Sequence, residues 1–101
     1  MIQQLTEDAI GLLKKLIQTP SLSREEDKSA SLLADFFQKK GLDVRRDKNN
    51  VWVEKINHPD FPYILLNSHH DTVKPSKNWE TNPFLPVEKE GKIIGLGSND
   101  A

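Results

Sequence analysis

Cysteine is absent from this sequence of 101 residues. No disulfide can therefore stabilise the fold, and no thiolate can bind a metal ion. Any metal site must be built from histidine and carboxylate side chains, and the chain has only 3 histidines. Those few histidines are therefore the first place to look for chemistry.

An excess of charge of one sign is also lacking, because 14 basic residues face 15 acidic ones and the net charge is −1. The basic excess that would attract nucleic acid or an anionic membrane is missing. No apolar run approaches the length of a membrane span, and the first residues lack the basic-then-apolar order of a secretory leader. We therefore expect a cytoplasmic protein without nucleic-acid or membrane partners. The 36% of hydrophobic residues allow one small domain with a thin core.

The first helical pattern lies near the N-terminus. Ile10, Leu13 and Ile17 recur at helical spacing, which predicts one apolar helix face. Thr6 is expected to cap this helix, because a threonine before an apolar repeat is a common N-cap. Pro20 is expected to end it, since proline cannot continue a helix.

A second helical pattern follows. Ser23 and Glu26 have the spacing of a capping box, which predicts that the helix begins between them. Gly41 suits the position just after its end. The apolar face of this helix is expected to consist of Ala30, Leu33, Phe36 and Phe37.

Strand patterns replace the helical ones after Gly41. Alternating residues predict strands at Leu42–Arg45 and Val51–Glu54, joined by a turn at Asp47–Asn50. Val87–Ile94 predicts a hairpin that turns near Gly91.

Tyr63–Leu66 is continuously apolar, which is typical of a strand buried on both faces. A long polar loop is expected from Thr72 to Pro83. The order of these patterns predicts an α/β fold, with two N-terminal helices followed by strands of a mixed sheet.

Two histidines and an aspartate follow the Tyr63–Leu66 segment directly, as His69, His70 and Asp71. Ligands bind beyond the carboxyl ends of strands in open α/β sheets. At the end of an extended segment, His69 and Asp71 project to one side and His70 to the other. His69 could then bind a metal ion while Asp71 accepts a hydrogen bond from its other ring nitrogen. The alternative from spacing alone is a hydrogen-bonded surface pair.

Gly95–Asp100 is a glycine-rich loop. It lacks the third glycine, the lysine and the following helix of phosphate-binding loops. It is either an ordinary glycine turn or a backbone that brings the Asp100 carboxylate into a tight space.

Three segments together resemble one known family: Ser68–Val73, Trp79–Phe84 and Gly91–Asp100. Their order, spacing and flanking residues are similar to the N-terminal part of the dinuclear zinc deacylases and carboxypeptidases. That family includes acetylornithine deacetylase, succinyl-diaminopimelate desuccinylase, glutamate carboxypeptidases and aminoacylases. The resemblance covers essentially the whole chain and implies that residues 1–101 are the N-terminal part of a zinc-dependent hydrolase catalytic domain.

The resemblance also implies roles for single residues. His69 would bind one zinc ion, Asp71 would be the catalytic-site carboxylate that orients His69, and Asp100 would bridge two zinc ions, for which cobalt could substitute. The remaining ligands and a glutamate base would lie beyond Ala101, so the resemblance implies a truncated chain without activity of its own.

The implied reaction is hydrolysis of an N-acyl amino acid. Many family members have an arginine where this chain has Leu96, and the pattern around Leu96 is most similar to the arginine-biosynthesis deacylases that act on N-acyl-ornithine. A dipeptidase or carboxypeptidase of the same family, and a non-enzymatic metal-binding or interaction domain, stay open as alternatives. The resemblance further implies a homo-oligomer.

Overall fold

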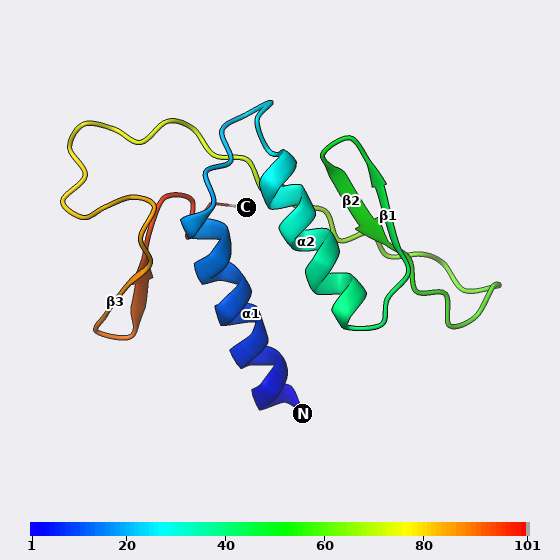
Figure 1. Ribbon diagram of the computed structural model, residues 1–101. Coiled ribbons are helices and arrows are strands. Elements are labelled where there is room, and N and C mark those ends of the chain that lie inside the picture. The colour runs from blue at the N-terminus through cyan, green and yellow to red at the C-terminus, as the bar shows by residue number, and fades with distance from the viewer. Residues whose placement is uncertain (101) are drawn as a thin grey trace.

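The computed structural model describes residues 1–100, which form two helices followed by two β-hairpins (Figure 1). This order confirms the predicted α/β class, with two helices preceding the strands. The β1–β2 hairpin packs against α2, and the β3–β4 hairpin lies on the other side, next to α1. The elements are α1 (Ile2–Gln18), α2 (Asp27–Lys39), β1 (Val44–Asp47), β2 (Asn50–Val53), β3 (Val87–Lys89) and β4 (Lys92–Ile94).

Helix α1 begins earlier than predicted. Its N-cap is Met1, and the Thr6 hydroxyl donates to Ile2 O at 2.9 Å inside the helix. The prediction that Thr6 caps α1 is therefore wrong. A threonine hydroxyl can bond the carbonyl one turn back, so it does not have to end a helix. The predicted end before Pro20 is confirmed, because α1 ends at Gln18.

The predicted capping box of α2 is also wrong. Glu26 takes the N-cap position without a side-chain cap bond, and its Oε1 instead accepts from the Arg24 backbone at 2.6 Å. Arg24 has a φ of 72°, which turns the chain sharply between Ser23 and the helix. Ser23 is thereby directed away from the helix terminus, and its hydroxyl donates to Asp71.

Both predicted hairpins are present as antiparallel pairs. Strands β1 and β2 begin and end within two residues of the predicted strands. In the β3–β4 hairpin, Glu90 and Gly91 have φ values of 53° and 74°. Two consecutive positive φ values are the requirement of the tight turns that match the twist of paired strands, which confirms the predicted turn at Gly91.

The strands predicted for a mixed sheet form two separate two-stranded sheets among the described residues. A single parallel bridge joins Leu22, between the helices, to Thr72. The prediction that Tyr63–Leu66 is a strand buried on both faces is wrong, because these residues are unpaired and are exposed by 73%, 88%, 85% and 91%. A strand needs a hydrogen-bonded neighbour, and no strand in residues 1–100 supplies one.

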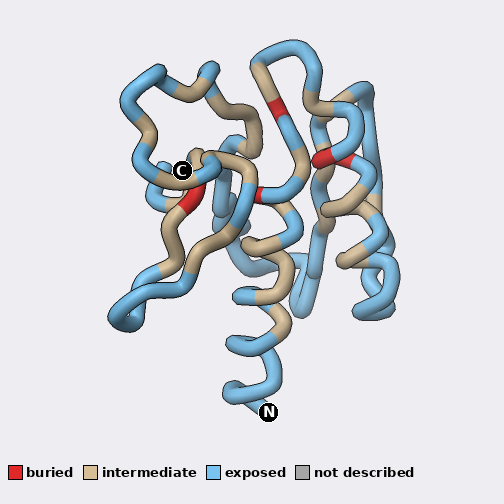
Figure 2. Tube along the Cα trace, turned by 60° about the vertical axis from the view of Figure 1, so that its left-hand side comes forward, coloured by how far each residue is buried: buried red, intermediate tan, exposed pale blue. Residues whose placement is uncertain are grey.

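The buried core is small. Ile17 and Ala30 are its buried hydrophobic residues, and Ser21 and Ser29 are buried with them. Figure 2 shows how short the buried stretches are along the trace. Both buried serines lie beside the segment that contains His69 to Asp71, so the most shielded part of this chain supports the candidate site. In the described part of the chain, no helix is both long and apolar enough to cross a lipid bilayer.

Candidate metal centre

The His69–Asp71 segment is attached to the loop between α1 and α2. The Ser21 hydroxyl donates to His70 O at 2.9 Å, and the Thr72 N–H donates to Ser21 O at 2.7 Å. Ser21 is only 4% exposed, so water competes little for these bonds. The backbone on both sides of the segment is therefore fixed.

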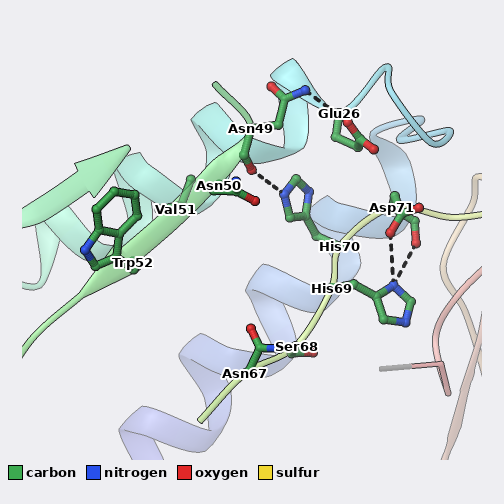
Figure 3. A pocket seen from close by; sticks show the side chains of 10 residues that line it. All are labelled: Glu26, Asn49, Asn50, Val51, Trp52, Asn67, Ser68, His69, His70 and Asp71. Atoms are coloured by element: carbon green, nitrogen blue, oxygen red, sulfur yellow. Dashed lines mark hydrogen bonds and ion pairs between the residues drawn. The ribbon is translucent and has the colours of Figure 1, made fainter. Parts of the chain in front are cut away.

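His69 and Asp71 lie on one side of the segment and His70 on the other, as predicted (Figure 3). His69 Nδ1 is 3.2 Å from the Asp71 carboxyl oxygen Oδ1 and 3.2 Å from Asp71 backbone O. Both oxygens can only accept, so Nδ1 carries a hydrogen, and in the neutral ring Nε2 keeps its lone pair. This is the tautomer in which a histidine binds a metal ion through Nε2.

Asp100 lies at that free nitrogen. His69 Nε2 is 3.6 Å from Asp100 Oδ2. Zinc–ligand distances of about 2.0–2.2 Å place two ligand atoms of one ion roughly 3–4 Å apart. The two atoms therefore have the spacing of neighbouring metal ligands, as predicted from the resemblance. The side chains are 49% and 76% exposed, so solvent and solutes can reach them.

Two glycines bring the terminal loop to this position. A Cβ on Gly95 would lie 2.6 Å from a side-chain carbon of Ile17 in α1. Gly97 has a φ of 77°, and a Cβ there would lie 2.8 Å from the Thr72 side chain. Only glycine allows these close approaches without displacement. The loop therefore runs against α1 and Thr72, which agrees with the interpretation that it delivers Asp100.

Asp71 is kept ionised by its neighbours. The hydrogen bond from the Ser23 hydroxyl lowers the pKa of the Asp71 carboxyl below its ordinary value, and attraction to His69 acts in the same direction. An ionised Asp71 accepts strongly from His69 Nδ1–H and makes Nε2 a better electron donor.

His70 is not available as a metal ligand. Its Nδ1 lies 2.7 Å from the Ser29 hydroxyl, and its Nε2 lies 2.9 Å from Asn49 O. Both ring nitrogens are thus occupied by the protein. Metal binding by His70 would break two hydrogen bonds, whereas His69 already has a free nitrogen.

No family model matches the chain. Curated relatives do match it. The chain is 31% identical over 97 residues to the succinyl-diaminopimelate desuccinylase of Nautilia profundicola, an alignment that covers 92% of this chain and 26% of the relative. The enzymes of the same name from Delftia acidovorans and Coxiella burnetii are each 30% identical, over 90% and 92% of this chain and 26% of each relative.

Over most of its length the chain is similar to these desuccinylases, as expected for the N-terminal part of such a protein. The resemblance inferred from the three sequence segments is thereby confirmed. The chain spans about a quarter of the length of the curated relatives that it matches.

The chain brings an imidazole nitrogen of His69 and a carboxylate oxygen of Asp100 close together. Within residues 1–100, no group of three or more histidine, cysteine, aspartate or glutamate side chains is arranged to hold a metal ion. The imidazole nitrogen and carboxylate oxygen are donors that zinc accepts, so the pair fits part of a zinc site. An open hollow of about 390 Å³ lies beside it, lined in part by Trp52, His69 and Asp71.

The sequence reasoning missed the serines that support the site. The capping pattern predicts Ser23 at the start of α2, whereas its hydroxyl donates to Asp71. Ser29 lies four residues before Leu33 and therefore on the apolar face of α2. A polar residue on an apolar face was a signal that it has a buried partner. Ser21 and Asn49 meet the site through tertiary contacts, which no local pattern reports.

Proposed function

We propose that His69, Asp71 and Asp100 belong to the active site of a metal-dependent amide hydrolase that removes the acyl group from an N-acyl amino acid. The observation that carries this proposal is the position of the His69 ring, with Nδ1 at Asp71 and Nε2 3.6 Å from Asp100. The similarity to succinyl-diaminopimelate desuccinylases supports the same reaction class.

His69 and Asp100 would hold zinc, or cobalt in its place, and Asp100 has a second carboxylate oxygen with which to bridge two ions. Zinc bound there would polarise an amide carbonyl and lower the pKa of a water molecule. Asp71 holds the His69 tautomer and ring orientation, and Ser23 keeps Asp71 ionised. The exposure of His69 and Asp100 leaves room for a small-molecule substrate.

The substrate class we infer is an N-acylated diamino acid. The named relatives support N-succinyl-diaminopimelate, and the sequence around Leu96 supports N-acyl-ornithine. Both molecules have an amide on one amino group and a second amine elsewhere, so one kind of site suits both.

An assay of the protein expressed from its whole reading frame tests this function. The substrates are N-succinyl-diaminopimelate, N-acetylornithine and a dipeptide, each with and without added zinc. Hydrolysis of an acylated amino acid is expected, together with its loss in His69→Ala and its retention in His58→Ala, which changes an exposed loop histidine. Hydrolysis of the dipeptide alone would replace the proposal by a dipeptidase, and no hydrolysis in the zinc-loaded protein would refute both.

Residues 1–101 by themselves are expected to bind zinc weakly and to show no turnover. Catalytic zinc sites usually use three protein ligands for each ion, whereas the described residues bring together two. Turnover by this segment that persists after repurification and disappears in His69→Ala would contradict this expectation.

A further inference from the structure

His70 is held by three different parts of the chain. Its ring contacts Ser29 in α2 and Asn49 in the turn between β1 and β2, and its backbone carbonyl accepts from Ser21 before α2. Figure 3 shows the ring directed toward Asn49, away from the side that carries His69 and Asp71. His70, which lies on the side opposite His69 and Asp71, is thus attached to the rest of the chain by three hydrogen bonds.

The hydrogen-bond partners fix the proton on this ring. Asn49 O is a backbone carbonyl and can only accept, so His70 Nε2 carries the hydrogen. In the neutral ring, His70 Nδ1 then accepts from the Ser29 hydroxyl. That hydroxyl also lies 3.0 Å from Glu26 O, which accepts the Ala30 N–H at 2.8 Å. Glu26 O therefore keeps a hydrogen-bond partner when the single Ser29 proton points to His70.

Asn49 is itself held in place. Its side-chain amide donates to Glu26 Oε2 at 3.0 Å, which links the hairpin turn to the start of α2. Ser29 is 0% exposed. A hydrogen bond shielded from water is stronger than an exposed one and costs more to break, so the ring has one well-defined position.

We propose that His70 is a positioning residue: held in its Nε2–H tautomer by Ser29 and Asn49, it anchors the backbone so that His69 and Asp71 project together on the other face, where Asp71 holds His69 in the opposite tautomer, Nδ1–H. Side chains alternate along an extended segment, so anchoring residue 70 on one face sets where residues 69 and 71 project on the other. A metal ligand must be held within a fraction of an ångström of its working position. The role of His69 as a metal ligand rests on the proposed function, whereas the pair of tautomers does not.

Nuclear magnetic resonance of the imidazole nitrogens tests this proposal directly, because the chain has only 3 histidines. The spectra are recorded without metal or substrate and at alkaline pH, so that neutral rings are observed. We expect Nε2–H for His70 and Nδ1–H for His69. His58→Ala, at the third histidine, is the control and should change neither signal.

Two variants separate positioning from packing. His70→Gln keeps a donor for Asn49 O and an acceptor for the Ser29 hydroxyl, whereas His70→Leu fills similar space without either. We expect His70→Leu to give mixed tautomers at His69. Hydrogen exchange of the Thr72 amide should become roughly five- to ten-fold faster, the size expected for losing one net hydrogen bond. His70→Gln should restore most of both properties.

An Nδ1–H tautomer at His70 in the unaltered chain would overturn the proposal. So would an unchanged His69 tautomer and unchanged Thr72 exchange in His70→Leu, because His70 would then only fill space. If His70→Leu does not fold by circular dichroism, the tautomers of the unaltered chain decide alone. Since no metal or substrate is present, failure here is distinguishable from failure of the deacylase assay.

Discussion

Two neighbouring segments of this chain differ in how firmly they are attached to the rest of the fold. Tyr63–Leu66 consists of four large apolar residues, yet they are 73–91% exposed. His69–Asp71 follows within three residues, is polar, and is attached through Ser21, Ser23 and Ser29. Apolar character therefore does not by itself bury a segment, because burial also needs a surface to pack against.

The molecule as a whole also exposes more surface than a compact protein of its size. A compact protein of this mass would expose roughly 5,800 Å², whereas this chain exposes 8432 Å². Its radius of gyration is 15.3 Å, against about 13 Å for a compact chain of this length. Tyr63–Leu66 is part of that excess surface, while the candidate site depends on hydrogen bonds to two buried serines.

The largest expected effect is within the site. His69→Ala should weaken zinc or cobalt binding by more than roughly 100-fold, beyond the cost of losing a ligand's hydrogen-bond partner. Asp71→Asn should weaken it roughly 10–100-fold, and His70→Ala roughly 10-fold, because neither residue contacts the metal. Competition titration against a chelator, on the protein from its whole reading frame, measures all three. A larger loss in His70→Ala than in His69→Ala would reverse the ligand assignment.

The second prediction compares the loss of stability on truncating a core residue with that on truncating a residue of Tyr63–Leu66. Ile17 is 4% exposed, so Ile17→Ala should lower the free energy of unfolding by about 2–5 kcal/mol. Leu65→Ala removes a similar volume from a side chain that is 85% exposed, and should change it by less than about 0.5 kcal/mol. Urea unfolding of both variants is the measurement. A comparable loss in Leu65→Ala would mean that Tyr63–Leu66 is covered in solution.

Self-association is the third expectation. An uncovered apolar segment with unpaired backbone groups tends to pair with another chain, so residues 1–101 should associate at high concentration. Leu65→Lys should reduce this association, because it places a charge in the segment. Light scattering measures the mass, and Val73→Lys, at a 76% exposed apolar residue outside the segment, is the matched control. A monomer at every concentration would contradict the expectation.

The smallest effect concerns the contact between the helices. The hydrogen bond and attraction of Lys40, helped by Gln4, lower the pKa of the Asp8 carboxyl. A lowered pKa stabilises the fold above the ordinary aspartate value of about 3.9, and the gain is lost as the pH falls through the lower folded value. Asp8→Asn should therefore be slightly less stable than the unaltered chain near neutral pH and equally stable in strong acid. The free energy of unfolding of both proteins is measured with urea at the two pH values. An equal difference between them at both pH values would exclude the Asp8–Lys40 contact as the cause.

Local patterns predicted the elements whose causes are local. The apolar repeat of Ile10, Leu13 and Ile17 predicted α1, and Gly91 predicted the turn between β3 and β4. Thr6 and Ser23 misled the prediction of helix starts, because a hydroxyl has several acceptors in reach and only the folded structure selects one. Tyr63–Leu66 misled it for another reason: a strand is defined by its neighbour, and the segment's own sequence does not contain the neighbour.

The site was predictable where it depends on alternation along one segment. The alternation predicts His69 and Asp71 on one side and His70 on the other, and Figure 3 shows this arrangement. The approach of Asp100 came from the family resemblance, since 31 positions separate it from His69 and no periodicity connects them. The roles of these residues as metal ligands and catalytic carboxylate stay predictions.

A zinc titration of the isotope-labelled chain, followed at the imidazole nitrogens, tests most directly whether His69 and Asp100 bind the metal together. His69 Nε2 is the free donor next to Asp100, whereas both His70 nitrogens are hydrogen-bonded. We expect His69 Nε2 to shift first and Asp100→Asn to raise the zinc concentration needed for that shift, with His70 unchanged. A first response at His70 or His58, or a His69 response that Asp100→Asn leaves unaltered, would contradict it.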